Sequence, residues 1–272
     1  MDLKNQFKKK NYKTAVILCG GRGTRLGALS KKIPKTLIKV QGKEILWYII
    51  NILKLNDFNH FIFPLGYKGN SIKKFIKKNN FFNTEVDLIE TGVNSNIGKR
   101  IYRIEKKIKS DNFLLMNGDA IFDFDLKKHF FIHNKKNYAS TFVASESIYQ
   151  YGTIGTQHGK VIDFKRNITH ESLNLKNKKN YLAYSYSGIL IINKNLLSKF
   201  RSKYKDYSNF EKQFFPKIIK NYKSNFIRLL GFFHSIDNVK DIDMVNNRNT
   251  FPIKFKKIKN IKKKIKNKFK KN

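Results

Sequence analysis

Apolar runs that are typical of buried strands alternate with amphipathic segments along the first half of the chain. The strand candidates are TAVILC (14–19), HFIFPLG (60–66), EVDLIE (85–90) and NFLLMNGD (112–119). Apolar positions at helical spacing mark helices over 44–55, 70–78, 97–108 and 125–136. Strands that alternate with helices in this way predict an α/β fold with a doubly wound, mostly parallel sheet covered on both faces.

The pattern changes at about Tyr138, where shorter strand-like pieces follow one another with fewer helices between them. These pieces lie at 138–145, 151–156, 159–164 and 184–192, and they predict a small mixed-sheet extension that shapes a substrate pocket. Two helices are then expected at 194–200 and 209–219. One strand over 225–237 and a last helix from Asn238 complete the predicted order.

The segment 249–272 stands apart, because apolar residues recur every three or four positions in an otherwise basic sequence. As a helix it would carry one apolar stripe, which is typical of an interfacial membrane helix. Peripheral contact with a membrane is therefore one interpretation. A solvated basic tail and a helix packed on its own domain are the others. The stripe consists of Phe255, Ile258, Ile261, Ile265 and Phe269.

Composition adds several limits to this picture. The chain has 272 residues, 40% of them hydrophobic, which is ample for a packed core. Its net charge of +38 reflects a general excess of lysine, although such a field also attracts nucleotides, nucleic acid or acidic membranes. With one cysteine, Cys19, no internal disulfide can form. Residues 1–13 lack the apolar region of a secretory signal, so we expect a cytoplasmic protein.

The sequence ILCGGRGTRLG (17–27) places glycines and two arginines directly after the first strand. It fits neither common phosphate-loop pattern: Leu26 stands where the dinucleotide motif needs glycine, and no Gly-Lys pair completes a Walker loop. Small residues still let backbone N–H groups close on phosphate oxygens, while Arg22 or Arg25 neutralises charge. Together with IPKTLIKV (33–40), the loop predicts a phosphate site.

GGRGTRLG followed by PKTLIKVQGKEILWYII resembles the N-terminal signature of the sugar-1-phosphate nucleotidyltransferases. The similarity continues through GYKG, NGD and GFFHSID to about residue 248. Within that family, ETGVNSNIGKRI and GFFHSIDNVKDIDMV are most similar to glucose-1-phosphate cytidylyltransferases, whereas YGTI and FEKQFFPKI are shared with heptose-1-phosphate guanylyltransferase-like enzymes. The resemblance therefore favours cytidylyl transfer to glucose 1-phosphate, and transfer of a guanylyl or other nucleotidyl group to a heptose or other sugar 1-phosphate is the alternative.

The resemblance implies a Rossmann-like nucleotidyltransferase core over 1–248, with a nucleotide-binding part at about 13–137 and a sugar-binding part at about 138–237. Such enzymes join an NTP to a sugar 1-phosphate and release pyrophosphate, with Mg²⁺ as cofactor. They supply activated sugars for polysaccharide synthesis. The resemblance therefore implies an NTP and a sugar 1-phosphate as partners and no specific nucleic acid. A homo-oligomer is a further interpretation, since many relatives form oligomers.

The resemblance also assigns roles to residues around the glycine loop. Arg25 would stabilise the leaving pyrophosphate and Lys35 the α-phosphate, both through permanent positive charge. Thr91 and Gly92 fall where cytidylyltransferases read the base, although an ordinary turn after a strand is the alternative. The backbone groups expected to cradle the nucleotide and its phosphates are those of Gly20, Gly21, Gly23 and Thr24.

Two aspartates would hold Mg²⁺ by the same resemblance. Asp119 ends an apolar run, where ligands of open α/β sheets bind, and it completes the catalytic set. Asp237 ends a later apolar strand. Helix capping is the alternative for both places, since Asp237 directly precedes the last helix and Asp123 or Asp125 would cap the helix after Asp119.

The sugar phosphate site departs most from the family pattern. FKRN (164–167) stands where relatives have F-x-E-K-P, so Lys165 or Arg166 has to supply the charge from an adjacent position. Alternation along a strand would send one of the two into the pocket and the other away. Gly152, Ser187 and Gly188 are the other sugar contacts that the resemblance implies, although Tyr186 or Ser187 replaces an expected asparagine there.

This departure keeps two other classes of function open. If neither Lys165 nor Arg166 reaches the sugar phosphate, the protein is a nucleotide-binding regulator without turnover. If the basic tail is the main functional element, the protein binds membranes or polyanions.

Overall fold

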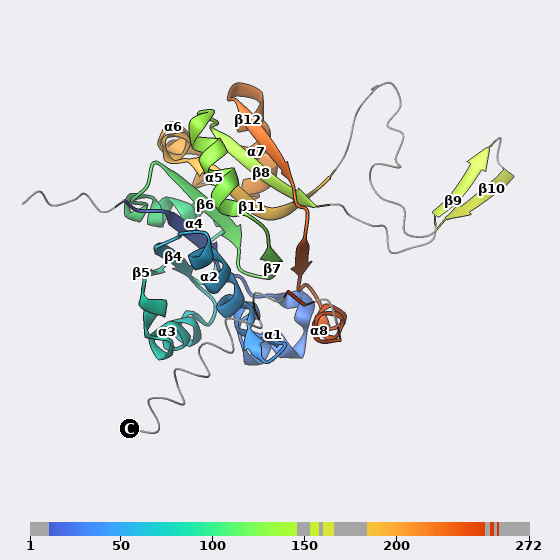
Figure 1. Cartoon of the computed structure of the whole chain (residues 1–272), viewed down its shortest axis with the longest axis horizontal. Helices are drawn as coiled ribbons and strands as arrows, with labels where there is room; N and C mark the ends of the chain where they lie inside the picture. The colour runs from blue at the N-terminus through green and yellow to red at the C-terminus, as the bar shows by residue number, and fades with distance from the viewer. Residues whose placement is uncertain are drawn as a thin grey trace, which may run out of the picture.

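The computed structural model describes residues 11–145, 153–157, 160–165, 184–247, 251–252 and 255, with backbone alone for 153–157 and 161–165. Its centre is a seven-stranded sheet in the order β12-β8-β11-β6-β1-β4-β5 (Figure 1). Within this sheet β11 runs antiparallel to both neighbours and the other pairs are parallel. The predicted α/β class with a mostly parallel sheet is confirmed. The strands are β1 (Thr14–Leu18), β4 (His60–Leu65), β5 (Glu85–Glu90), β6 (Asn112–Asn117), β8 (Ser140–Ser145), β11 (Ser185–Asn193) and β12 (Ser224–Arg228).

Three two-stranded pairs accompany this sheet in the described residues. They are β2 (Lys39–Val40) with β3 (Lys43–Glu44), β7 (Ala120–Asp123) with β13 (Phe232–Ser235), and β9 (Thr153–Gln157) with β10 (Lys160–Lys165). The strands that follow Tyr138 therefore divide: β8, β11 and β12 extend the central sheet itself, and β9, β10 and β13 lie in the small pairs.

Eight α-helices lie in the described part of the chain, and polar side chains begin most of them. They are α1 (Ala28–Lys32), α2 (Ile45–Leu55), α3 (Gly69–Lys78), α4 (Ile97–Ile104), α5 (Leu126–Lys135), α6 (Lys194–Tyr204), α7 (Phe210–Asn221) and α8 (Val239–Asn246). The side chains of five residues each accept a backbone N–H of the following first turn: Asn96, Asp125, Asn193, Asn209 and Asn238. Asp125 is thus the cap of α5, as the capping alternative expected. Asn238, and not Asp237, caps α8.

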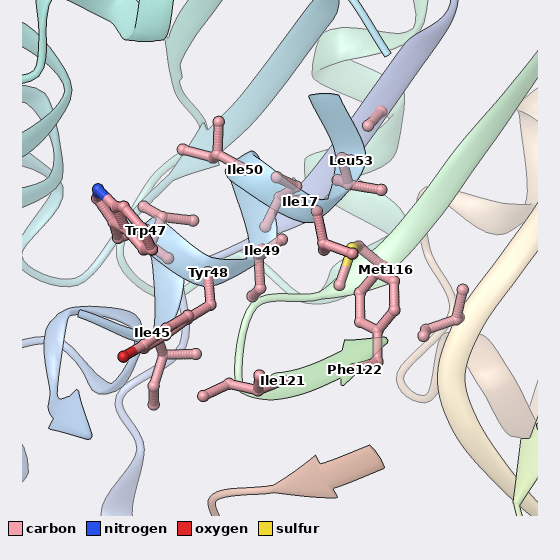
Figure 2. Close-up of a cluster of buried hydrophobic side chains, with 14 of the residues drawn as sticks. Ile17, Ile45, Trp47, Tyr48, Ile49, Ile50, Leu53, Met116, Ile121 and Phe122 are labelled. Carbon is pink, nitrogen blue, oxygen red and sulfur yellow. The ribbon is translucent and has the colours of Figure 1, made fainter. Parts of the chain in front are cut away.

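Successive residues of each central strand enter different cores on the two faces of the sheet. Ala15 and Ile17 of β1 belong to a core with α2, α3 and α5, whereas Val16 between them packs with α4, α6 and α7. Figure 2 shows part of the first core, where side chains of α2 meet Ile17, Met116 and β7. Strands covered on both faces need apolar residues throughout, which explains the unbroken runs in the sequence.

Gly98 permits a close helix contact in the second core, between α4 and α6. A Cβ at Gly98 would lie 2.0 Å from the carbonyl oxygen of Tyr204, a backbone atom that cannot move alone. We expect Gly98→Ala to lower the free energy of unfolding by about 3 kcal/mol, measured by urea denaturation. Gly21→Ala is the matched control, because no atom lies within 4 Å of a Cβ there. Equal stability of the two variants would contradict this packing.

The single strand predicted over 225–237 is wrong, because the chain forms two strands there in different sheets. β12 pairs with β8 at the edge of the central sheet, and β13 pairs antiparallel with β7. Between them Gly231 has φ +132°, a conformation that L side chains rarely adopt, and a Cβ there would lie 2.9 Å from the carbonyl oxygen of Asp123. The break lets the second strand cross to β7.

Phe255, the first residue of the predicted basic stripe, is part of the core. Its ring lies 4.9 Å from that of Tyr48 and 5.5 Å from that of Phe251, and it is fully buried. At this position the chain packs on its own domain. The remaining stripe positions lie outside the described residues. In the part of the chain that the structure describes, no helix combines the length and apolar character needed to cross a membrane.

Candidate active site

A cavity of about 1050 Å³ opens at the carboxyl ends of β1 and β6. In an open α/β sheet this edge is where ligands bind, because the loops that leave parallel strands meet there. The cavity brings together residues from the glycine loop, from the loop after β6, from β11 and from the end of β13. The sequence-predicted residues that line it are Gly21, Gly23, Thr24, Arg25, Lys35, Asp119, Ser187, Gly188 and Asp237.

The glycine loop packs directly over Lys35. Gly23 has φ +62°, and a Cβ at this position would meet the Cβ of Lys35 at 3.3 Å, so glycine satisfies both the backbone conformation and the contact. Lys35 begins a short 3₁₀ helix (Lys35–Leu37) after Pro34. Arg22 of the glycine loop donates to Asn94 Oδ1 at 3.0 Å. The loop and the lysine are therefore held as one unit beside the cavity.

The Lys35 ammonium joins the two predicted metal-binding aspartates. Its Nζ donates to Asp119 Oδ2 at 2.8 Å and to Asp237 Oδ1 at 2.9 Å. Arg25 reaches the same oxygen of Asp237 at 3.3 Å from an exposed position. Ser235 Oγ donates to the other carboxylate oxygen at 3.1 Å. Two cations and two carboxylates thus form one network on the cavity wall.

The pairing of β7 with β13 brings Asp237 to Asp119. Asp119 directly precedes β7, and its carbonyl oxygen accepts the N–H of Ile236 at 2.9 Å. Since Asn238 caps α8, with its own N–H bonded to Asp241 Oδ2, the Asp237 side chain is not needed at the helix end. The Asp237 carboxylate instead accepts a hydrogen bond from Lys35.

The protonation states follow from this network. Burial alone would lower the pKa of Lys35, but the charge of Asp119 and hydrogen bonds to both aspartates outweigh it, so the pKa is raised. Burial alone would raise the pKa of Asp237, but Lys35, Ser235 and Arg25 together lower it. Lys35 therefore stays cationic and Asp237 anionic throughout the neutral range.

This pairing predicts an acid-dependent contribution to stability. A carboxyl whose folded pKa is depressed stabilises the fold above its unfolded pKa, here near 3.8, and loses that contribution as the pH falls through the folded value. Asp237→Asn should therefore be less stable than the wild type at pH 7, and the difference should shrink as the pH falls below 3.8 through the depressed folded pKa of Asp237. Urea denaturation between pH 2.5 and about 7 measures it. A difference that is independent of pH would contradict an ion-pair origin.

The donor set of this network fits a divalent cation. Magnesium takes oxygen ligands and is commonly held by one or two carboxylates together with substrate phosphates. Asp119 and Asp237 are such carboxylates, and both reach one cationic atom. No cluster of three or more His, Cys, Asp or Glu side chains occurs within the described residues. The phosphates of a substrate would have to complete the coordination.

Gly20 and Thr91 are not among the residues that line the cavity, and both contact the buried Arg100 of α4. The Arg100 guanidinium donates to the carbonyl oxygens of Gly20 at 3.0 Å and Leu65 at 3.1 Å, and to Thr91 Oγ1 at 2.8 Å. Val93 contributes a fourth acceptor at 3.3 Å. The network links the ends of β1, β4 and β5. Gly92, next in the chain, has φ +86° and is likewise outside the cavity lining.

The predicted sugar phosphate residues are only partly described. Ser187 and Gly188 of β11 line the cavity, and Ser187 Oγ donates to the Val143 carbonyl oxygen at 2.7 Å. Gly188 has φ +76°, and a Cβ there would meet Asn117 Nδ2 at 2.7 Å. Lys165 ends β10 with its side chain outside the description. Gly152 and Arg166 lie outside the described residues.

The family was identified by comparison with known proteins. A family model described as nucleotidyl transferase matches residues 14–229, most of the chain. The chain belongs to the nucleotidyl transferase family. The resemblance to sugar-1-phosphate nucleotidyltransferases is thereby confirmed, and this nucleotidyl transferase is an enzyme of that class.

Two curated relatives differ in the nucleotide that their names state. A probable glucose-1-phosphate cytidylyltransferase of Bacillus subtilis is 31% identical over 179 residues, covering 58% of this chain and 70% of the relative. A D-glycero-alpha-D-manno-heptose 1-phosphate guanylyltransferase of Campylobacter jejuni is 34% identical over 114 residues, covering 42% and 51%. Among solved structures, HddC from Yersinia pseudotuberculosis matches with a TM-score of 0.63 at 23% identity, over 86% of this chain and 98% of HddC. The similarity to HddC shows the fold of this chain.

Two residues of this nucleotidyl transferase were not singled out from the sequence. Arg100 falls with Ile97, Ile101 and Ile104 on the buried face of α4, so a cation at an apolar position was a readable signal. Glu211 lines the cavity from the first turn of α7, but an acid after an N-cap is common, and the sequence offered no sign that it faces the site.

Proposed function

We propose that this nucleotidyl transferase transfers a cytidylyl group from CTP to glucose 1-phosphate and releases pyrophosphate, in the presence of Mg²⁺. The contact of one lysine with two carboxylates, at the carboxyl edge of the sheet and beside the glycine loop, carries the proposal. The choice of base and sugar is supported by the similarity to the Bacillus subtilis relative.

The chain's own residues suit phosphoryl chemistry without a covalent intermediate. Attack by the sugar phosphate oxygen on the α-phosphorus spreads negative charge over the transferred group and the leaving pyrophosphate. Lys35 and Arg25 supply positive charge next to that position, and the glycine loop leaves backbone N–H groups open to phosphate oxygens. Asp119 and Asp237 would hold Mg²⁺, which when bound neutralises phosphate charge and orients the oxygens.

A guanylyl transfer to a heptose 1-phosphate is the second candidate. The similarity to the Campylobacter jejuni relative favours it, with the higher identity over a shorter segment. The chemistry at the transferred phosphorus is the same in both candidates. The difference lies in the base and the sugar, so it can be settled only with the substrates themselves.

Pyrophosphate release tests the proposal. We would combine five nucleotides, CTP, GTP, UTP, dTTP and ATP, with a panel of hexose and heptose 1-phosphates in the presence of Mg²⁺. Release that requires CTP and glucose 1-phosphate supports the first candidate, and release that requires GTP and a heptose 1-phosphate supports the second. Asp119→Asn should abolish release, whereas Asp111→Asn, the same change at an exposed position, should not. Nucleotide binding without release for any pair would favour the regulator.

A further inference from the structure

Four carboxylate side chains line the cavity in the part of the chain that the structure describes, and three of them are hydrogen-bonded. Asp119 and Asp237 share Lys35, and Asp241 accepts backbone N–H groups at the start of α8. Glu211 is the fourth. The described residues offer its carboxylate neither a hydrogen-bond donor nor an ion-pair partner.

Glu211 lines the same cavity as the aspartate network and β11. It is half-buried in the first turn of α7. Burial and the charge of Asp119 raise its pKa above the ordinary value, and its own charge adds to burial in raising the pKa of Tyr186 on β11. Its charge therefore interacts with Asp119 and with Tyr186, and both of these residues line the same cavity.

An unpartnered, half-buried carboxylate is unfavourable for folding, because it loses part of its hydration and gains no bond in exchange. The chain has 57 lysines and arginines against 19 aspartates and glutamates, yet none of those that the structure describes pairs with Glu211. A group kept in this state at a cavity wall is available to a ligand that brings hydrogen-bond donors of its own.

The charges of the cavity indicate which part of a ligand Glu211 would bind. Lys35 and Arg25 attract phosphate, whereas a carboxylate repels it. Ser145 and Ser185, from the ends of β8 and β11, line the cavity on the same strand pair as Tyr186. A ligand with an anionic group and a neutral body rich in hydroxyls matches this division. We propose that Glu211 accepts hydrogen bonds from ring hydroxyls of the sugar 1-phosphate and thereby selects the sugar.

This inference rests on the proposed transferase function, and Glu211→Gln tests it because it keeps the shape and removes the charge. We expect kcat/KM for the preferred sugar 1-phosphate to fall about 10- to 100-fold, mainly through KM, the range of a hydrogen bond to a charged group. The KM for the nucleotide should not change. Glu211→Asp, which keeps the charge on a shorter side chain, should recover part of the loss. Glu85→Gln, at the opposite end of the sheet, is the matched control.

Deoxy analogues of the sugar 1-phosphate give a second readout. If Glu211 binds a given hydroxyl, removing that hydroxyl weakens the wild type but has little further effect in Glu211→Gln, because the two changes remove one interaction. Additive losses for every analogue would overturn the proposal. The thermal midpoint should be unchanged or higher in Glu211→Gln, whereas a lower midpoint together with unchanged KM would indicate a structural role.

Two further measurements distinguish this inference from a metal-binding role of Glu211 and from a failure of the proposed function. Weaker Mn²⁺ binding by Glu211→Gln in the absence of sugar would place the carboxylate with the metal and overturn the proposal. If the wild type turns over no substrate pair, the proposed function fails. Calorimetric binding of glucose 1-phosphate to the wild type and Glu211→Gln then decides the inference by itself, and equal affinities would refute it.

Discussion

Replacement of Lys35 by methionine is expected to lower kcat for pyrophosphate release about 100- to 1000-fold. The ammonium contacts Asp119 and Asp237, the two groups suited to hold Mg²⁺, and lies under the glycine loop. Methionine keeps much of the side-chain volume and removes the charge that would act on the transferred phosphate. Steady-state pyrophosphate release with saturating nucleotide and sugar phosphate measures the effect.

The control for this prediction is Lys39→Met, the same change at an exposed position on β2. It should retain activity within about twofold, as surface substitutions rarely exceed 0.5 kcal/mol. Lys35→Arg keeps the charge in a longer planar group, so it should recover only part of the rate. Full activity of Lys35→Met would show that the lysine serves only to separate the two aspartates and takes no part in the reaction.

The second large effect is expected on stability, from Arg100→Met. Arg100 is 5% exposed and donates to four acceptors that belong to the ends of β1, β4 and β5 and to the following loop. Methionine would leave these buried acceptors without donors, and a buried group stripped of its partner costs about 1–3 kcal/mol. We expect the free energy of unfolding to fall by about 3 kcal/mol in urea denaturation.

Arg103→Met is the matched control for Arg100→Met. Arg103 lies one turn further along α4 and is exposed, and its guanidinium donates to the Thr91 carbonyl oxygen and, at 3.4 Å, to Ser95 Oγ. Water can replace it there, so the loss should stay below about 1 kcal/mol. Equal losses of unfolding free energy in the two variants would show that the burial of Arg100 adds nothing to its effect on stability. Activity should also fall in Arg100→Met, because Gly20 leads into the glycine loop.

The sequence was sufficient for most local structure. Runs such as 60–66 and 112–119 contain the strands β4 and β6, because strands buried on both faces need apolar side chains at every position. Helix starts were readable where a short polar side chain precedes the apolar pattern, as at Asp125 and Asn238. The error at 225–237 arose because apolar residues continue through Gly231, so the pattern could not show that the chain changes sheets there.

Residue types and spacing, with the family resemblance, singled out Lys35, Asp119 and Asp237 as candidates. Only the tertiary structure decided that one ammonium contacts both carboxylates across separations of 84 and 202 residues, since this depends on the pairing of β7 with β13. It also decided that Glu211 faces the cavity with no partner among the described residues and that Phe255 belongs to the core. Local patterns record the preferences of neighbouring residues, whereas contacts between distant segments depend on how the whole sheet is assembled.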